Sequence, residues 1–296
     1  MALVTSILNL KGGVGKTTVT VALAEVLAAQ YRLKVLVIDL DPQASATLCL
    51  MSQLRWAERR ATQRTLYNLF QFLLNGSAAL SAEDLIETRT SNLAGGAGHL
   101  HLIPSSIELI DLFDRMERMH EIGQMPDYDV SPLHVLKDFV SPLFARYDYV
   151  LIDCPPTLNT LTRNGLLVSQ AVLIPFVPDI ISLIGVDPLL DHLRRIATLQ
   201  NLRLQPVGLL ATRVDARLPL HQKVLERVRL RARQRHDFPE LFQVQIPNRI
   251  AYAEAMEWSR SFPTLHAKYG GDDFAPWDAF AKEFVERLNS LAAPSP

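Results

Sequence analysis

A glycine-rich stretch with two lysines, residues 10–18 (Leu-Lys-Gly-Gly-Val-Gly-Lys-Thr-Thr), has the residue types that bind a polyphosphate. It follows an apolar run at 3–8 and precedes a helix-patterned segment at 19–29. Glycines let the backbone curl so that several N–H groups point inward, and a helix N-terminus adds unpaired N–H groups and a positive dipole. In such a loop Lys16 would reach the β- and γ-phosphates and the Thr17 hydroxyl would hold Mg²⁺. The alternative, a plain glycine turn with two solvated lysines, does not explain the strand–turn–helix context.

Carboxylates end two other apolar runs. Asp39 and Asp41 close the run at 35–38, and Asp153 closes the run at 149–152. Ligands of an open parallel sheet bind at the carboxyl ends of its strands, and residues i and i+2 of an extended chain point the same way. A triphosphate with Mg²⁺ needs a lysine, a hydroxyl and carboxylates around it, so these aspartates are candidates for the same site. A solvated acidic turn is the alternative for the first pair.

Strand-like runs alternate with helix-like runs along the chain, and several are continuously apolar, as strands buried on both faces are. This alternation predicts an α/β fold with a mostly parallel sheet and helices on both faces. We expect one domain over residues 1–296, with a helical insertion and a flexible loop at 54–98 and a frayed tail at 292–296. The expected strands are 3–8, 35–38, 101–103, 149–152, 171–176, 207–211 and 244–246.

Composition narrows the class of protein. The chain of 296 residues is 48% hydrophobic and 21% charged with a formal net charge of −1, so any nucleic-acid surface must be local. Its two cysteines suggest neither a disulfide framework nor a metal site. We expect no signal peptide, because the first strand starts almost at once, and no membrane span, because no apolar run approaches about 18 residues. The expected location is the cytoplasm.

The loop departs from the standard phosphate-loop pattern, because Leu10 stands where that pattern has glycine and Lys11 follows it. This Lys-Gly-Gly-Val-Gly-Lys-Thr-Thr variant resembles the deviant Walker A box of the ParA/MinD ATPases. The resemblance implies a nucleotide-sandwich dimer in which Lys11 reaches across to the phosphates of the partner subunit. It also implies that the whole box binds ATP, namely Lys11, Gly12, Gly13, Val14, Gly15, Lys16, Thr17 and Thr18.

Two further boxes extend the resemblance. The Asp-x-Asp-Pro-Gln run at 39–43 is similar to the family's second box, and the run ending at Asp153 is similar to its Walker B strand. By that resemblance Asp41 would position or polarise the attacking water, Asp39 would support the Mg²⁺ shell, and Asp153 would hold Mg²⁺ through water. The implied catalytic residues are therefore Lys11, Lys16 and Asp41, and the implied metal site is Thr17, Asp39 and Asp153.

Weaker matches follow later in the chain. Arg213 lies at a position where relatives contact the nucleotide base. Pro247 and Asn248 belong to a motif near the C-terminus whose sequence in relatives is commonly Ile-Pro-Arg-Asn-Val-Arg. This chain reads Ile-Pro-Asn-Arg-Ile-Ala at 246–251, so the arginine and asparagine are exchanged and the last arginine is absent. The Asp-Pro-Gln run favours the ParA/Soj branch over MinD, whose C-terminal membrane helix has no counterpart in the segment at 280–288. That segment instead has the pattern of a core-packing helix.

Relatives in the ATP-bound dimeric state bind DNA non-specifically through arginines, and Arg217 matches one such position. Between residues 217 and 236 there are seven Lys or Arg and one Glu, and four of the cations recur every four residues. Such spacing places Lys223, Arg227, Arg231 and Arg235 on one helix face, which suits sequence-independent attraction to phosphates. A solvated helix face is the alternative. A second cluster, Arg55, Arg59, Arg60 and Arg64, is expected to face solvent rather than a partner.

Together these features predict a Mg²⁺-dependent ATPase that forms an ATP-sandwich homodimer, binds double-stranded DNA non-specifically and associates with the nucleoid. A ParB-like adaptor would stimulate hydrolysis, and the cycle would position an origin, a plasmid or a protein cluster, with no role for a membrane. Three alternatives remain open: positioning of a protein cluster or cell-pole component without DNA segregation, a non-hydrolysing nucleotide-gated scaffold, and a relative of the nitrogenase iron protein. The last would need cluster-bridging cysteines, a context that neither Cys49 nor Cys154 has.

Overall fold

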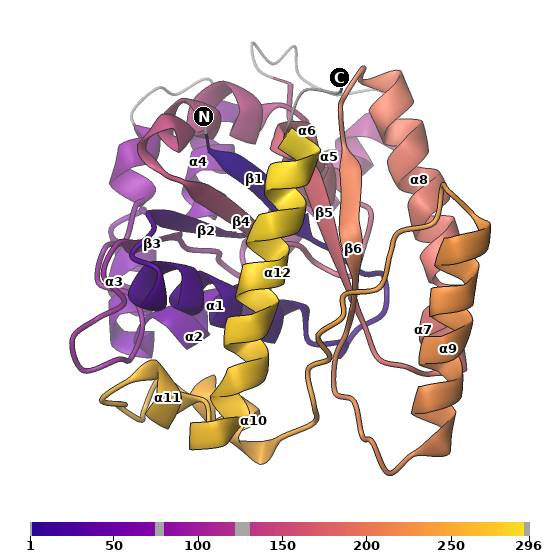
Figure 1. Cartoon of the computed structure of the whole chain (residues 1–296). Helices are drawn as coiled ribbons and strands as arrows, with labels where there is room; N and C mark the ends of the chain where they lie inside the picture. Colours follow the sequence, from indigo (N-terminus) through magenta and orange to yellow (C-terminus); the bar gives the residue numbers. More distant parts are fainter. Residues whose placement is uncertain (1, 75–79, 122–130, 293–296) are drawn as a thin grey trace.

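Six parallel strands form one sheet in the order β3-β2-β4-β1-β5-β6 (Figure 1). This computed structural model describes residues 2–74, 80–121 and 131–292. The strand order reverses at β1, since the chain moves to one side of it for β2 and to the other for β5, so the loop after β1 lies where ligands of such sheets bind. The strands are β1 (Leu3–Ile7), β2 (Val35–Asp39), β3 (Leu100–Ile103), β4 (Tyr149–Asp153), β5 (Ala171–Phe176) and β6 (Gln205–Ala211).

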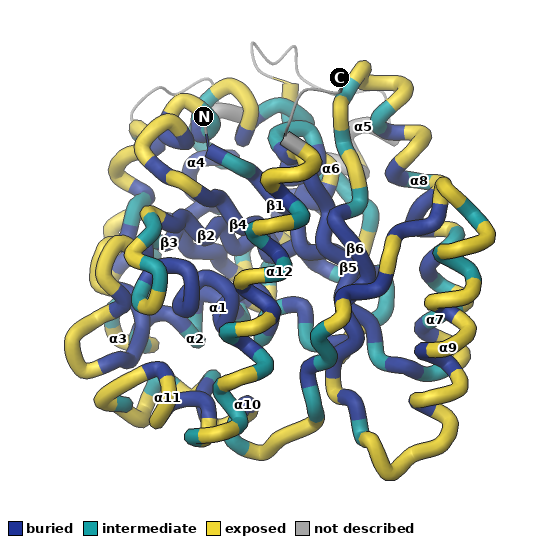
Figure 2. Tube along the Cα trace, in the orientation of Figure 1, coloured by how far each residue is buried: buried dark blue, intermediate teal, exposed yellow. Residues whose placement is uncertain are grey.

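Helices cover both faces of the sheet, as the alternating pattern predicted (Figure 1). Alternate residues along the strands contribute to two separate hydrophobic cores, and Figure 2 shows the buried strands between helices with exposed outer sides. One core includes α1 (Lys16–Glu25), α2 (Ser45–Leu50), α10 (Ile250–Ala255), α11 (Leu265–Lys268) and α12 (Ala275–Ala292). The other includes α4 (Leu66–Leu74), α5 (Leu109–Glu121), α6 (Thr160–Val168), α8 (Val186–Leu199) and α9 (Pro219–Gln234).

The predicted strand at 244–246 is wrong. Isolated bridges flank this stretch on either side, Leu209 with Leu241 and Val214 with Pro247. Within it, Ile246 donates its N–H to the Ala211 carbonyl at 2.9 Å and accepts from the Val214 N–H at 3.0 Å. The backbone N–H groups of Gln243 and Val244 donate instead to the Glu283 carboxylate of α12, at 2.9–3.2 Å. Because these donors are taken by a side chain, no continuous ladder forms at this edge.

The segment at 54–98 contains α3 (Gln53–Ala61), α4 and a 3₁₀ turn at Ala82–Leu85, followed by a loop. Residues 75–79 of the predicted insertion and 293–296 of the predicted tail lie outside the described residues. The loop is tied to the C-terminal third, because the buried Asn92 side chain donates to the carbonyls of Glu257 and Arg260 and accepts from Lys268.

A fully buried ion pair joins α1, the helix after the glycine-rich loop, to α11. The Lys268 Nζ atom lies 2.6 Å from Glu25 Oε1, and neither side chain is exposed. The Tyr269 hydroxyl donates to the other Glu25 oxygen at 2.7 Å, so the buried carboxylate is well satisfied. The end of α1 is thereby held against α11.

None of the helices in the described part of the chain is both long enough and apolar enough to traverse a bilayer.

Candidate nucleotide site

The loop between β1 and α1 has the backbone geometry of a phosphate cradle. Gly13 and Gly15 have φ angles of +74° and +84°, a region that side chains disfavour. Gly15 is the N-cap residue of α1 and offers no side-chain cap, so the first N–H groups of that helix are available to an anion.

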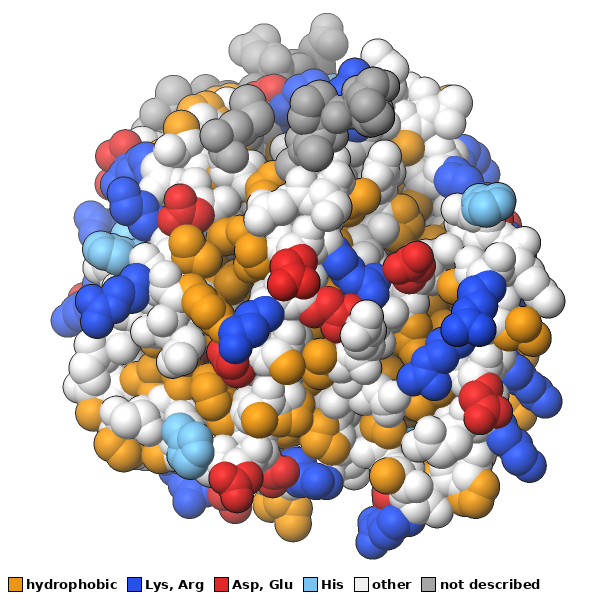
Figure 3. Space-filling model, in the orientation of Figure 1, with side chains coloured by type: hydrophobic (Ala, Val, Ile, Leu, Met, Phe, Trp, Pro, Cys, Tyr) orange, Lys and Arg blue, Asp and Glu red, His pale blue; other side chains and the backbone are white. Residues whose placement is uncertain are grey.

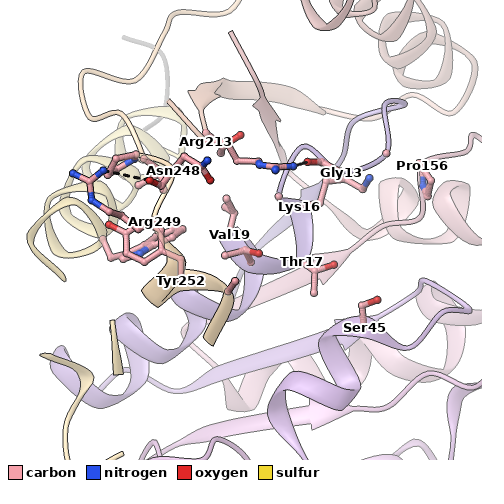
Figure 4. A pocket seen from close by; sticks show the side chains of 18 of the residues that line it. Gly13, Lys16, Thr17, Val19, Ser45, Pro156, Arg213, Asn248, Arg249 and Tyr252 are labelled. Carbon is pink, nitrogen blue, oxygen red and sulfur yellow. Dashed lines mark hydrogen bonds between the residues drawn. The ribbon is translucent and has the colours of Figure 1, made fainter. Parts of the chain in front are cut away.

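A cavity of about 490 Å³ opens beside this loop. Figure 4 shows Lys16 and Thr17 on the loop side and Asn248, Arg249 and Tyr252 on the opposite wall. The structure therefore brings together, around one cavity, most of the residues that the sequence predicted for ATP and catalysis. These are Gly12, Gly13, Gly15, Lys16, Thr17, Thr18, Asp41, Arg213, Pro247 and Asn248.

Sequence reasoning missed several lining residues, among them Arg249, Tyr252 and Trp277. The rings of Tyr252 and Trp277 meet edge to face with centroids 5.3 Å apart, and the Tyr252 hydroxyl donates to the Asp273 carbonyl. Arg249 forms an ion pair with the Asp273 carboxylate at 2.7 Å. An aromatic and apolar wall with polar edges suits the base and ribose of a nucleotide. No local pattern marked these residues, because α10 has only six residues and α12 reads as an ordinary core helix.

Asp153 and Thr17 form the candidate metal site. The Thr17 hydroxyl donates to Asp153 Oδ2 at 2.7 Å, and the Thr20 hydroxyl donates to Oδ1 at 3.1 Å. Burial of the carboxyl raises the pKa of Asp153 to about 6, and the hydroxyl donors only partly oppose this shift. A hydroxyl and a buried carboxylate fit Mg²⁺, which takes its other ligands from phosphates and water. Among the described residues, no group of three or more His, Cys, Asp or Glu side chains could hold a metal by itself.

Lys16 faces the same cavity and is only 8% exposed. Burial lowers the pKa of its ammonium group, while the carboxylates of Asp153 and Asp41 act in the opposite direction. The buried ammonium group of Lys16 can therefore bind the oxygens of a polyphosphate in this cavity.

Asp39 has contacts that differ from those expected of a metal-shell residue. Its Oδ2 accepts from the Thr47 N–H at 2.8 Å and the Thr47 hydroxyl at 2.7 Å, while Oδ1 accepts from the Asp41 N–H at 3.1 Å. The side chain is fully buried and lines no part of the cavity. Burial, and secondly the Asp153 carboxylate, raise the pKa of Asp39 well above its ordinary value. Its observed contacts hold the loop that carries Asp41.

The two residues after β6 hold the phosphate loop from the other side. The Thr212 hydroxyl donates to the Val14 carbonyl at 2.7 Å, and Arg213 Nη1 donates to the Gly13 carbonyl at 3.0 Å. Arg213 adopts a left-handed φ of +51°, a strained conformation that occurs at functional sites. Val14 itself is fully buried and does not line the cavity, although the sequence placed it among the ATP-binding residues.

Lys11 does not line the nucleotide cavity in this structure. Its Nζ atom lies 2.8 Å from Asp179 Oδ2 and 3.1 Å from the Ser182 hydroxyl. Asp179 is the N-cap residue of α7 (Ile180–Ile184), which carries two strongly exposed apolar side chains, Ile181 at 72% and Ile184 at 66%.

The basic stripe is only partly available to a ligand. Arg231 and Arg235 both pair with Asp187, at 2.5 and 2.9 Å, so part of the predicted charge is compensated. Lys223 and Arg227 are exposed and pair with no carboxylate in the part of the chain that the structure describes. Figure 3 shows Lys and Arg side chains gathered on the right, where Figure 1 places α9.

Arg217 also has a carboxylate partner, because its guanidinium pairs with Asp215 at 2.7 Å.

Most arginines of the second predicted cluster, at residues 55–64, bind carboxylates or carbonyls of the same chain. Arg55 pairs with Glu87, Arg60 pairs with Glu108, and the buried Arg59 donates to backbone carbonyls. It is not an unoccupied basic patch.

Comparisons with known proteins agree with this geometry. A protein family described as "AAA domain" matches residues 2–206. An uncharacterized protein of Pseudomonas putida is 33% identical over 287 residues, covering 97% of this chain and 96% of that protein. The chromosome-partitioning ATPase Soj of Treponema pallidum is 30% identical over 279 residues, covering 94% and 95%.

Among solved structures, a putative plasmid partition protein of Borrelia burgdorferi bound to AMPPNP superposes with a TM-score of 0.71. That similarity covers 97% of this chain and 99% of that one at 22% identity, and it shows the fold. The matching family, the Soj relative and the deviant Walker A loop of the sequence all indicate the same family. The chain belongs to the ParA/Soj family of P-loop ATPases.

Proposed function

We propose that this protein is a Mg²⁺-dependent ATPase, one domain over residues 1–296, that converts ATP and water to ADP and phosphate in order to partition or position a cargo. The observation that carries the proposal is the contact of the Thr17 hydroxyl with the buried Asp153 carboxylate, 2.7 Å apart, beside a cavity that Lys16 and Asp41 also line. The printed name of the Soj relative supports the link to chromosome partition.

Each residue has a role that follows from its place. Thr17 and Asp153 would hold Mg²⁺, which when bound offsets charge on the β- and γ-phosphate oxygens. Lys16 binds the same phosphates through its ammonium group. Asp41 accepts a hydrogen bond from the attacking water and orients it toward the γ-phosphate, and Arg213 and Thr212 keep the loop in the binding conformation.

A homodimer completes the site in this proposal. Lys11 lies outside its own cavity, so it is free to act on a nucleotide in trans once its contact with Asp179 opens. The exposed isoleucines of α7 lie beside it and are suited to burial between two copies.

DNA binding is proposed for the exposed cations of α9, Lys223 and Arg227, with Arg217, Arg231 and Arg235 contributing once their carboxylate partners are displaced. Such contacts are sequence-independent and would place the dimer on the nucleoid in the cytoplasm. A ParB-like adaptor would stimulate hydrolysis and release the DNA. Positioning of a protein cluster without DNA segregation is the second candidate. It is favoured by the carboxylate pairing within the stripe and by Ala251, which stands where relatives have an arginine.

Phosphate release measured with and without Mg²⁺ and random-sequence DNA tests the enzyme. Asp41→Asn should abolish release but keep ATP binding, because Asp41 lies outside the loop backbone that cradles the phosphates. Asp138→Asn is the matched control, since Asp138 is an exposed acid remote from the cavity. ATP-dependent dimerisation without phosphate release in a single-turnover assay would instead identify a nucleotide-gated scaffold.

A further inference from the structure

A second cavity, of about 270 Å³, lies between α6 and α8. It shares no lining residue with the nucleotide cavity and belongs to the sheet face opposite α1. Its lining combines basic with apolar side chains, and none of the described residues that line it is acidic. The main contributors are Arg163, His192, Arg195, Leu167, Ile196 and Leu199.

The two arginines of this cavity lack a counter-charge. Neither Arg163 nor Arg195 forms an ion pair with a residue in 2–74, 80–121 or 131–292. The adjacent Arg194 offers a contrast, because it pairs with Asp191 at 2.8 Å and with Asp237 at 2.5 Å. Asp191 also lies one helical turn before Arg195, yet it pairs with Arg194 and not with Arg195. Both arginines are exposed residues that line the same cavity, so an anion bound there could accept charge-assisted hydrogen bonds from both guanidinium groups.

His192 supplies an independent sign of a missing partner. Its Nε2 atom is buried and has no hydrogen-bond partner among the described residues. Buried polar atoms are nearly always paired, so an unpaired one commonly marks a water, ion or ligand position. Burial, followed by the charges of Arg195 and Arg163, lowers the pKa of the imidazole, so both arginines lie near enough to His192 to act on its charge.

We propose that this cavity binds a small amphiphilic anion, a carboxylate or phosphate monoester carried on a short apolar body. The guanidinium groups of Arg163 and Arg195 would hold the anionic head, and Leu167, Ile196 and Leu199 would pack against the apolar part. The cavity, of about 270 Å³, lies at the lower end of the range for small-molecule sites, which suits a small ligand of this kind.

Four probes of this size distinguish an anionic ligand from a neutral or a cationic one. They are the anions hexanoate and butyl phosphate, the neutral 1-hexanol and the cation hexylammonium. Each is titrated into the full chain while the NMR signals of the His192 ring are followed, with His192→Gln used to assign them. Saturable shifts with an anion are expected at about 1–20 mM, the range for ligands of this size. Selectivity between hexanoate and butyl phosphate identifies the head group. Equal binding of 1-hexanol, or no saturation by either anion, would overturn the proposal.

Variants locate the binding. Arg163→Gln together with Arg195→Gln should weaken binding of the preferred anion about tenfold or more, because charge-assisted hydrogen bonds are lost. Arg233→Gln, an exposed arginine of α9, is the control and should bind as the wild type does. Leu199 is 74% exposed, so Leu199→Asp should fold normally and block the anion with its own carboxylate. Unchanged binding in both the double variant and Leu199→Asp would refute the site.

Discussion

The Nζ atom of Lys11 lies 2.8 Å from the Asp179 carboxylate, so the loop's first lysine is held by its own chain outside the nucleotide cavity. Asp179 also caps α7, because its Oδ1 accepts from the Ser182 N–H at 2.7 Å. Hydrogen bonding by Lys11 and by Ser182 outweighs burial and lowers the pKa of Asp179. In the proposed dimer this ion pair must open before Lys11 can reach another subunit.

Asp179→Asn should favour ATP-dependent dimers. The amide keeps the helix cap but removes the charge that holds Lys11. Both side chains are about one-third exposed, so each pair contributes at most about 1 kcal/mol. Two pairs open per homodimer, so the dimerisation constant should improve no more than about thirtyfold. Sedimentation with a non-hydrolysable ATP analogue measures this change. Asp191→Asn, an exposed acid of α8, is the control, and weaker dimerisation of Asp179→Asn would show that the pair supports the dimer instead.

Thr212→Val should loosen the phosphate loop. The substitution keeps the shape of the side chain but removes the hydroxyl that donates to the buried Val14 carbonyl. An unpaired buried carbonyl costs about 1–3 kcal/mol, so we expect a matching loss of unfolding free energy and roughly tenfold weaker ATP binding. Denaturant titration and calorimetry measure the two effects. Thr212→Ser, which retains the hydroxyl, should remain close to the wild type; equal losses in both variants would assign the effect to packing.

The stability of the nucleotide-free protein should fall as the pH rises from about 4 to about 6. The pKa of Asp153 is raised from 3.8 to about 6 in the folded chain, so the folded state binds the proton more tightly than the unfolded state. This contribution is fully present below about pH 4 and is lost as the pH rises through about 6, a change of about 3 kcal/mol. Other groups titrate in the same range, so Asp153→Asn provides the comparison.

Denaturant titrations give the unfolding free energy of the wild type and of Asp153→Asn at each pH. The change of this free energy with pH should differ most between the two proteins from pH 4 to pH 6, the interval between the unfolded and folded pKa values of Asp153. Parallel curves would contradict the assignment. Addition of MgATP should flatten the wild-type curve above pH 6, because a bound cation stabilises the charged carboxylate.

Lys223→Glu combined with Arg227→Glu should weaken binding to random-sequence DNA without altering ATP affinity. Both cations are exposed on α9 and pair with no described carboxylate, unlike Arg231, which pairs with Asp187. Gel shifts in the presence of the ATP analogue should show at least tenfold weaker binding and a shallower salt dependence. Lys34→Glu with Arg64→Glu applies the same charge change elsewhere. Equal losses in both double variants would indicate net charge rather than a DNA surface.

Much of the fold and the phosphate site could be predicted because their signals are local. Each of the strands β1, β2 and β4 is an apolar run that ends beside a glycine loop or an aspartate, and these ends meet at one sheet edge. The register of β2 against β4 places Asp39 directly opposite Asp153.

The rest depends on contacts between distant residues. Lys11 and Asp179 are 168 positions apart, and Arg231 and Asp187 are 44 apart, so no local pattern shows that these cations are paired. The apolar run at 244–246 has strand composition, yet Glu283 takes the N–H groups beside it and prevents a ladder.

The measurement that bears most directly on the account is light scattering of Lys11→Ala with a non-hydrolysable ATP analogue. Because Lys11 lies outside its own cavity, the variant should bind the analogue as the wild type does. It should nevertheless stay monomeric at concentrations where the wild type dimerises, whereas Lys16→Ala should lose nucleotide binding itself. Dimerisation of Lys11→Ala equal to that of the wild type would contradict the role of this lysine across the dimer.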